Sequence, residues 1–415
     1  MSQPAACFLF RFVSFCVSRP AQPVAAVIIL ALGLSQIIGY GTLYYSFSIL
    51  APGMARDFSL SNEQIFGFFS AALLVGGLTA PSIGRWMDRL GAAKVMVFGS
   101  LFAALTLCLC ALSPSMIVFA VGIVLAQIAS GMVQYQAAFA ALVESEPLTA
   151  PRSITYLTLI AGFASTLFWP ITTALANRFD WQTVYFIFAA LNFVICLPLH
   201  VWLASRGNSH RVLSANVHRQ PVEGVLTDEL RKRGILIVSL AFGLQGFALS
   251  SLLTHMVPML EGLGLGVMAV TIAALFGPSQ VASRLINMIF GSDFPPLALA
   301  MLSATLTAAG GFMLGLSGGA LVGSVIFVLS LGLGSGIGSI AQGSVPLHLF
   351  GSQGYGAVTG RITAARLAFG SAAPFVFSFL METIGIQNAL MVNAALGALG
   401  ILCFLFVASG GARAG

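Results

Sequence analysis

Apolar residues run along the chain in long stretches that polar residues rarely interrupt. A helix needs about 20 mostly apolar residues to cross the hydrocarbon core of a bilayer, and twelve stretches reach that length in two sets of six. The first set covers 24–52, 63–83, 92–112, 115–142, 153–177 and 181–204. The second set covers 234–260, 267–291, 296–316, 319–344, 355–381 and 386–408. The pattern predicts an all-α integral membrane protein with twelve transmembrane helices.

One long polar segment separates the two sets, and we expect it to join two pseudo-symmetric six-helix bundles. The expected organisation is a cytoplasmic leader at 1–22, a bundle at 23–204, a cytoplasmic linker at 205–233, a second bundle at 234–408 and a cytoplasmic tail at 409–415. A cleaved signal peptide needs a continuous apolar core. Arg11 interrupts the leader, which therefore does not fit that pattern.

Basic residues gather on one side of the predicted bundles. Lys and Arg accumulate in cytoplasmic loops, and this bias sets the orientation of a membrane protein. With the N-terminus inside, fourteen of the 18 basic residues fall in the cytoplasm, at positions 11, 19, 85, 89, 94, 152, 206, 211, 219, 231, 232, 233, 361 and 413. Arg56 and Arg178 fall outside, and the other two lie within spans. We predict a multi-pass protein of the cytoplasmic (inner) membrane with both termini in the cytoplasm.

The composition excludes most other classes of protein. Hydrophobic residues make up 58% of the chain and charged residues 7%, whereas a soluble domain carries about 25% charged residues. This excludes a cytosolic enzyme and a nucleic-acid-binding protein, despite the net charge of +6. The sequence contains no nucleophile–base set, phosphate-binding loop or cluster with metal-ligand spacing. We predict no enzymatic activity, no metal and no cofactor.

Two arginines lie inside predicted spans, Arg284 in the eighth and Arg366 in the eleventh. An ionisable side chain within the bilayer is costly and by default points to a function. No Asp or Glu lies in a span interior to pair with them, and the guanidinium fork matches a carboxylate. We expect both arginines to bind a small anionic substrate. The competing interpretation is that they bond backbone carbonyls or seal the seam between the bundles.

The first half carries clustered polar groups instead of buried charges. Gln36, Tyr40 and Tyr44 recur at intervals of four and share one face of the first span. Gln127 and Gln134 share a face of the fourth span through their spacing of seven. Such side chains must face protein or a water-filled cavity, so we expect them to form the cavity wall opposite the arginines. Hydrogen bonds that hold the helices together are the alternative.

The seventh span adds two polar candidates, Gln245 and His255. We expect Gln245 to contribute to the substrate site. The imidazole of His255 titrates near neutral pH, which makes it a candidate for proton coupling. The alternative is that His255 is a hydrogen-bonded residue near the outer end of the span.

The segment after the second span reads Gly84-Arg-Trp-Met-Asp88-Arg89-Leu-Gly91-Ala-Ala-Lys94. Its Asp can accept hydrogen bonds from the N-terminus of a neighbouring helix. The segment resembles the signature loop of the major facilitator superfamily, Gly-x-x-x-Asp-Arg-x-Gly followed by basic residues. With the twelve spans and the central basic loop, the resemblance extends over essentially the whole chain. It implies that these five named residues form a latch between the bundles in the outward-open state.

Two further similarities concern the second half. Gly291-Ser292-Asp293 repeats part of the signature after the eighth span. A basic residue in the eighth span and another in the eleventh resemble the oxalate/formate antiporter and monocarboxylate porter families. In those families the two positions bind substrate carboxylates.

These features favour a secondary active transporter that moves a mono- or dicarboxylate by alternating access. We expect it to act as a monomer in the lipid bilayer, as a symporter or antiporter that uses protons or a counter-anion. One alternative is an efflux transporter for a toxic, drug-like or metalloid compound, in which the arginines are structural. Another is a non-transporting sensor on the same fold. The sequence leaves the direction of transport open.

Overall fold

A computed structural model describes residues 23–213, 221–291 and 294–411 of the chain. Within these ranges, twelve helical segments are long and apolar enough to cross a membrane. This confirms the predicted number of spans and the all-α class. The predicted leader lies outside the described residues, as do Ser292 and Asp293 of the second-half repeat.

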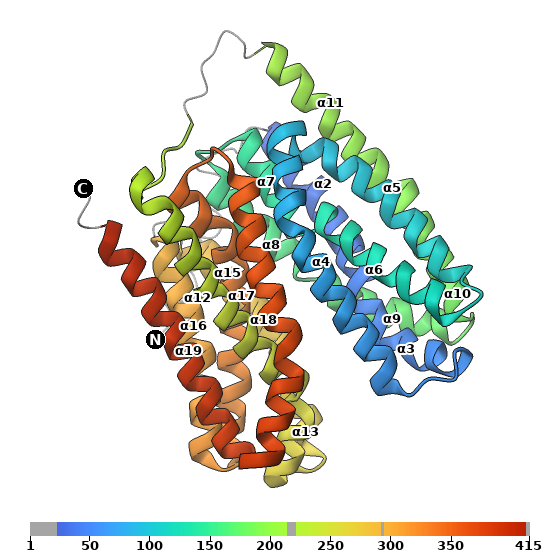
Figure 1. Cartoon of the computed structure of the whole chain (residues 1–415), viewed down its shortest axis with the longest axis vertical. Helices are drawn as coiled ribbons and strands as arrows, with labels where there is room; N and C mark the ends of the chain where they lie inside the picture. Colours follow the sequence, from blue (N-terminus) through green and yellow to red (C-terminus); the bar gives the residue numbers. More distant parts are fainter. Residues whose placement is uncertain (1–22, 214–220, 292–293, 412–415) are drawn as a thin grey trace, which may run out of the picture.

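The spans form two bundles that follow one another along the chain (Figure 1). The first bundle contains α2 (Pro23–Tyr40), η1 (Gly41–Tyr45), α3 (Ser46–Asp57), α4 (Asn62–Leu90), α5 (Ala92–Ala111), α6 (Met116–Val133), α7 (Tyr135–Ser145), α8 (Ala150–Ala161), α9 (Ala164–Ala176), α10 (Trp181–Leu191), η2 (Asn192–Cys196) and α11 (Leu197–Leu213). The second contains α12 (Asp228–Thr254), α13 (Met256–Leu260), η4 (Glu261–Leu265), α14 (Met268–Ala273), α15 (Phe276–Phe290), α16 (Pro296–Ser317), α17 (Leu321–Phe350), α18 (Tyr355–Ile384) and α19 (Ile386–Gly411).

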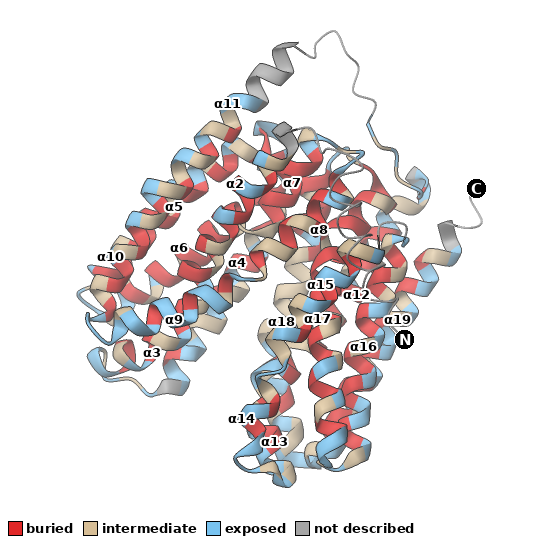
Figure 2. Ribbon diagram, turned by 180° about the vertical axis from the view of Figure 1, so that it is seen from behind, coloured by how far each residue is buried: buried red, intermediate tan, exposed pale blue. Residues whose placement is uncertain are grey.

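The two bundles converge at one end and diverge at the other (Figure 1). We call the converging end, where the chain passes from α11 to α12, the linker end, and the opposite end the far end. Of three apolar cores among the described residues, one joins both bundles, with Ala141 and Val345 among its members. The other two each belong to a single bundle, around Phe188 in the first and Phe327 in the second. Figure 2 shows buried residues inside each bundle and at the end where the bundles converge. The bundles therefore share a core at one end only.

Close contact between α4 and α18 contributes to the closed linker end. A side chain at Gly84 would collide with the backbone carbonyl of Gly356. A side chain at Gly360 would likewise lie 2.5 Å from the carbonyl oxygen of Ala80. Glycine at these positions lets the two helices approach each other to backbone distance.

Helix α4 is longer than the sequence predicts. It begins with a capping box in which Ser61 and Gln64 bond each other's backbone N–H groups. It ends only at Gly91, whose φ of 95° lies in the region that favours glycine. The predicted signature loop is thus largely the end of a helix, and Asp88 and Arg89 lie in its last turn.

Besides the sixth span, which contains the π-helical turn η2, three spans of the first bundle are interrupted, with no proline at the break. The first span contains the π-helical turn η1, the fourth breaks at Gln134, and the fifth breaks at Gly162–Phe163. A break releases backbone carbonyls that need new partners inside a membrane. These three interruptions shape the site described below.

The end of the linker is ordered against the second bundle. Residues 221–227, which we call the linker strap, lie along the C-terminal end of α17. The N–H of Val225 donates to the carbonyl of His348 at 3.1 Å, and the N–H of Leu226 donates to that of Leu349 at 3.1 Å. The last carbonyls of a helix lack partners within the helix, so the strap satisfies part of the end of α17.

Candidate functional site

Four tyrosines of the first bundle lie together around the breaks in its first and fourth spans. Tyr40 ends α2, Tyr44 and Tyr45 belong to η1, and Tyr135 begins α7. The ring centroids of Tyr40 and Tyr135 are 4.9 Å apart, and those of Tyr44 and Tyr45 are 5.3 Å apart. Because a π-helical turn is wider than an α-helical one, it displaces the residues of η1 from the regular helix face. Two adjacent side chains, Tyr44 and Tyr45, thereby join one group.

Arg366 of the second bundle faces this group. It lies in α18, and its guanidinium is within electrostatic reach of Tyr40 and Tyr44. The side chain is half-buried, and its stem packs against Gly246, where an added Cβ would lie 2.8 Å from Cγ of the arginine. Among the described residues no hydrogen bond or ion pair engages the guanidinium. The positive charge of Arg366 is thus left without a protein counter-charge.

Arg284 approaches the same tyrosines from α15. It is 4% exposed, its Nε–H donates to the Ser339 hydroxyl at 3.2 Å, and its Nη1 is buried without a hydrogen-bond partner in the described part of the chain. Tyr45 and Tyr135 lie within electrostatic reach of its charge. We call these two arginines and four tyrosines the arginine–tyrosine cluster. The structure therefore brings both predicted arginines to the tyrosines of the opposite bundle.

Two of the predicted glutamines point into the first bundle. Gln36 is fully buried, and its amide donates to the carbonyl of Val133 at 2.7 Å. That carbonyl is released by the break in the fourth span, because the N–H of Ala137 bonds Gln134 instead. Gln127 is 5% exposed and donates to the carbonyl of Leu43 in η1 at 3.0 Å. In this conformation, both amides brace helix breaks.

The other predicted polar residues lie in different surroundings. Gln134 occupies the N-cap position of α7 at the break itself without a side-chain capping bond, and its amide nitrogen has no partner among the described residues. Gln245 donates to the Ser303 hydroxyl at 2.5 Å, which ties α12 to α16 within the second bundle. His255 ends α12, where its Nε2 lies 2.9 Å from the carbonyl oxygen of Pro374. Gln245 and His255 are therefore each engaged by the bundle to which they belong.

The predicted latch residues meet α18 at the linker end. The two carboxylate oxygens of Asp88 accept the N–H groups of Gly356 and Ala357, each at 2.8 Å. These N–H groups belong to the first turn of α18, where a helix leaves its donors unpaired and favours a negative charge. Arg89 and Lys94 are exposed, and Gly91 ends α4. Asp88 is the latch residue that bridges the two bundles.

A second carboxylate beside the latch was not predicted from the sequence. Both oxygens of Glu144, at the end of α7, accept the N–H of Ala92 at 3.0 Å. Ala92 begins α5, directly after the α4 residues that carry Asp88. Two acidic side chains thus cap two helix N-termini at the linker end. Glu144 could have been noticed as an acid at a span end, but its partner depends on tertiary packing.

The cluster and its surroundings include residues that the sequence did not single out as site residues. Tyr45 and Tyr135 belong to the cluster and lie at helix breaks. Ser339 of α17 accepts a hydrogen bond from Arg284 of α15. Nothing in the described part of the chain brings together three His, Cys, Asp or Glu side chains that could hold a metal ion. The cluster therefore presents guanidinium and phenol groups to a ligand.

The fold is shared with solved transporters of low sequence similarity. The human organic anion transporter MFSD10 (TETRAN) is 16% identical, with a TM-score of 0.70 over 92% of this chain and 100% of that one. The transporter FucP in its outward conformation is 15% identical, with a TM-score of 0.68 over 91% and 98%. The proton:xylose symporter XylE bound to 6-bromo-6-deoxy-D-glucose is 14% identical, with a TM-score of 0.68 over 91% and 95%.

Sequence comparison gives the family directly. A search of curated protein sequences finds no match. Residues 32–374, however, match the Major Facilitator Superfamily, which covers most of both bundles. The chain belongs to the major facilitator superfamily.

Proposed function

We propose that this transporter moves a small organic anion, a mono- or dicarboxylate, across the cytoplasmic membrane by alternating access. The observation that supports this most is the pair of arginines that face the tyrosines across the bundle interface. Arg366 has no hydrogen bond or ion pair within the described residues, and Nη1 of Arg284 has no partner there. An anion would supply the missing negative charge, with Arg as the side chain best shaped for a carboxylate. One fold neighbour is itself named an organic anion transporter.

The proposed mechanism follows from the closed linker end. We place this end, the linker and both termini in the cytoplasm, because basic residues concentrate there. The structure then corresponds to an outward-facing state, in which substrate reaches the cluster from the far end. Asp88 holds α4 to α18 in this state, and release of its two hydrogen bonds would let the linker end open. Closure of the far end would complete the cycle for the monomer.

Transport by the reconstituted protein tests the proposal. Uptake of labelled mono- and dicarboxylates into proteoliposomes would be compared for wild type, Arg366→Ala and Arg284→Ala. A hydrogen bond to a charged group is worth about 1.5–3 kcal/mol, so each variant should lose roughly tenfold or more in anion affinity. Imposed pH gradients and counter-anions in the same vesicles would identify the coupled ion and show whether His255→Gln uncouples it.

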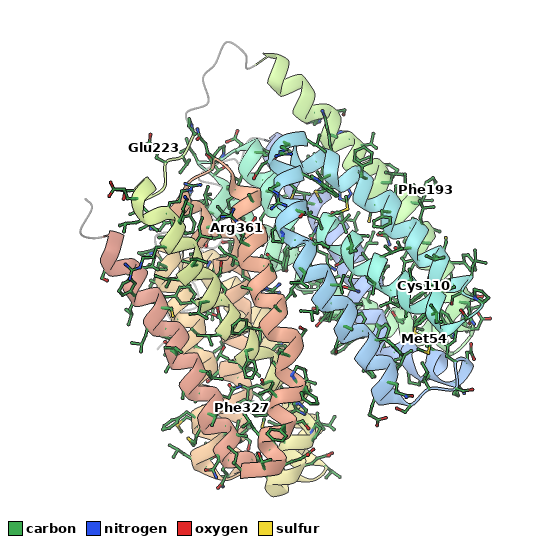
Figure 3. All side chains as sticks on the ribbon, viewed as in Figure 1. Met54, Cys110, Phe193, Glu223, Phe327 and Arg361 are labelled. Atoms are coloured by element: carbon green, nitrogen blue, oxygen red, sulfur yellow. The ribbon has the colours of Figure 1, made fainter. Side chains whose placement is uncertain are left out.

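Arg361→Ala is the matched control, because Arg361 is an exposed arginine of the same helix, near its linker end (Figure 3). Its uptake should equal that of wild type. If no anion is carried, or if the two cluster variants transport as well as Arg361→Ala, the anion proposal is wrong. Efflux of toxic, drug-like or metalloid compounds would then be measured in cells.

A further inference from the structure

The arginine–tyrosine cluster continues into an aromatic surface on the first bundle. The ring of Tyr44 lies 5.9 Å from that of Phe69, and the ring of Tyr45 lies 6.2 Å, edge to face, from that of Trp169. Tyr44 is 41% exposed and Trp169 is 52% exposed, so other protein groups leave part of each side chain uncovered. The tyrosines of the cluster are therefore continuous with further aromatic rings of the first bundle.

Four of the side-chain amides that could recognise hydroxyl groups are engaged elsewhere, and the amide nitrogen of a fifth, Gln134, is enclosed at the break in the fourth span. Gln36 and Gln127 donate to backbone carbonyls within the first bundle, and Gln136 donates to the carbonyl of Ala80 at 3.0 Å. Gln245 is bonded to Ser303 in the second bundle. A substrate rich in hydroxyl groups needs a hydrogen-bond partner for each group it buries. The cluster offers guanidinium and phenol groups instead, which suit one charged group attached to a flat apolar body.

We propose that the substrate is an aromatic carboxylate, whose carboxylate binds Arg366 and whose ring packs against Tyr44. This inference rests on the proposed function, because it takes the cluster to be the transported anion's binding site. Aromatic rings attract one another beyond simple burial of area, through offset-stacked or edge-to-face contacts. The Tyr44 side chain is 41% exposed and lies within electrostatic reach of the Arg366 guanidinium, and we place the acid between the two.

Aromatic acids and their saturated analogues separate this proposal from general anion binding. The pairs are benzoate with cyclohexanecarboxylate, and naphthoate with decahydronaphthoate, which match in charge and approximate size. One or two ring contacts favour the aromatic member by roughly tenfold. Equilibrium dialysis against the full-length protein in lipid nanodiscs, with empty nanodiscs subtracted, gives the affinity of each acid. Wild type should bind the aromatic acids about tenfold more tightly than their saturated partners.

Variants then assign the preference to one ring. Tyr44→Leu should bring the affinity ratio close to one, and Tyr44→Phe should keep it, because the ring remains. Phe193→Leu is the control, since Phe193 is an exposed aromatic residue of the same bundle, at 52% exposure against 41% for Tyr44, and lies in η2 (Figure 3). Its ratio should match that of wild type.

The outcomes separate failure of this inference from failure of the proposed function. If saturated and aromatic acids bind equally, or if Tyr44→Leu leaves the ratio unchanged, the aromatic specificity is wrong. Binding that Arg366→Ala removes would in that case still support anion transport. If none of these acids, nor any carboxylate of the uptake panel, binds to the protein, both proposals are overturned.

Discussion

The guanidinium of Arg284 occupies the space that a side chain at Gly162 would fill. An added Cβ at Gly162 would collide with Nη1 of the arginine, which comes from the opposite bundle. Gly162 follows the last residue of α8, where the fifth span breaks. The C-terminus of a helix carries partial negative charge, so this end offers partial compensation to a buried cation. The break in the fifth span and the position of Arg284 are therefore parts of one arrangement.

Gly162→Ala should displace Arg284 with little effect on folding. The atom in the way is the end of a flexible side chain, which can move aside without a shift of backbone. We expect anion affinity to fall about fivefold to tenfold, since a charged hydrogen bond is worth about 1.5–3 kcal/mol and displacement removes part of it. Competition binding measures this change, and thermal unfolding should show a change below about 1 kcal/mol.

Gly277→Ala is the control for this variant. Gly277 lies in α15 with Arg284, and an added Cβ there would have no neighbour within 4 Å. Unchanged affinity in Gly162→Ala would show that the position of Arg284 does not matter for binding. A similar loss in both variants would point to a general effect of alanine in these helices.

Asp88→Asn should weaken closure of the linker end. An amide can accept through one oxygen only, so one of the two N–H groups of Gly356 and Ala357 loses its partner. The negative charge at the N-terminus of α18 is lost as well. We expect the closed state to lose about 1–3 kcal/mol, which changes the ratio of closed to open molecules by roughly 5- to 150-fold.

Spin labels at Lys94 and Arg361 would report this shift, because both side chains are exposed at the linker end of different bundles. Distance distributions in a cysteine-free background should move toward longer values in Asp88→Asn. Arg89→Gln should behave like wild type, since Arg89 is exposed in the same helical turn. A distribution that Asp88→Asn leaves unchanged would refute the role of Asp88 as a latch.

The sequence predicts the transmembrane spans and the position of Asp88 better than it predicts which residues line the candidate site. Long apolar stretches give the twelve helices, and the signature segment identifies Asp88, whose partner is the N-terminus of α18. Gln36 and Gln127 donate to backbone carbonyls at helix breaks, and no residue pattern in the sequence predicts these breaks. If the regular α-helical repeat is continued across η1 or past Gln134, the side chains beyond the break are placed on the wrong face of the helix. Tyr45 and Tyr135 were missed as site residues for the same reason.

Gln127→Leu distinguishes a bracing residue from a substrate-binding one. Leucine is similar in volume but leaves the buried carbonyl of Leu43 without a partner, which costs about 1–3 kcal/mol. We therefore expect a lower midpoint in thermal unfolding, with the Michaelis constant for the anion unchanged within about twofold. A higher Michaelis constant with unchanged stability would instead assign Gln127 to the substrate site.

Arg231→Ala should loosen the first turn of α12 from the turn between α17 and α18. The Arg231 guanidinium donates to the carbonyl of Phe350 at 2.6 Å and to that of Gln353 at 3.0 Å. It thereby fixes the turn between α17 and α18 that precedes the N–H groups bound by Asp88. Loss of two partly exposed charged hydrogen bonds should lower the free energy of unfolding by about 1–3 kcal/mol. Lys232→Ala, an exposed neighbour, should leave it unchanged.

The same variant links the start of α12 to the latch. If the turn at 351–354 presents α18 to Asp88, Arg231→Ala should also lengthen the distance between labels at Lys94 and Arg361, in the same direction as Asp88→Asn. Because both substitutions act on one contact, their effects on the closed state should be less than additive when combined. Fully additive effects would mean that Arg231 stabilises the second bundle alone and does not act through Asp88.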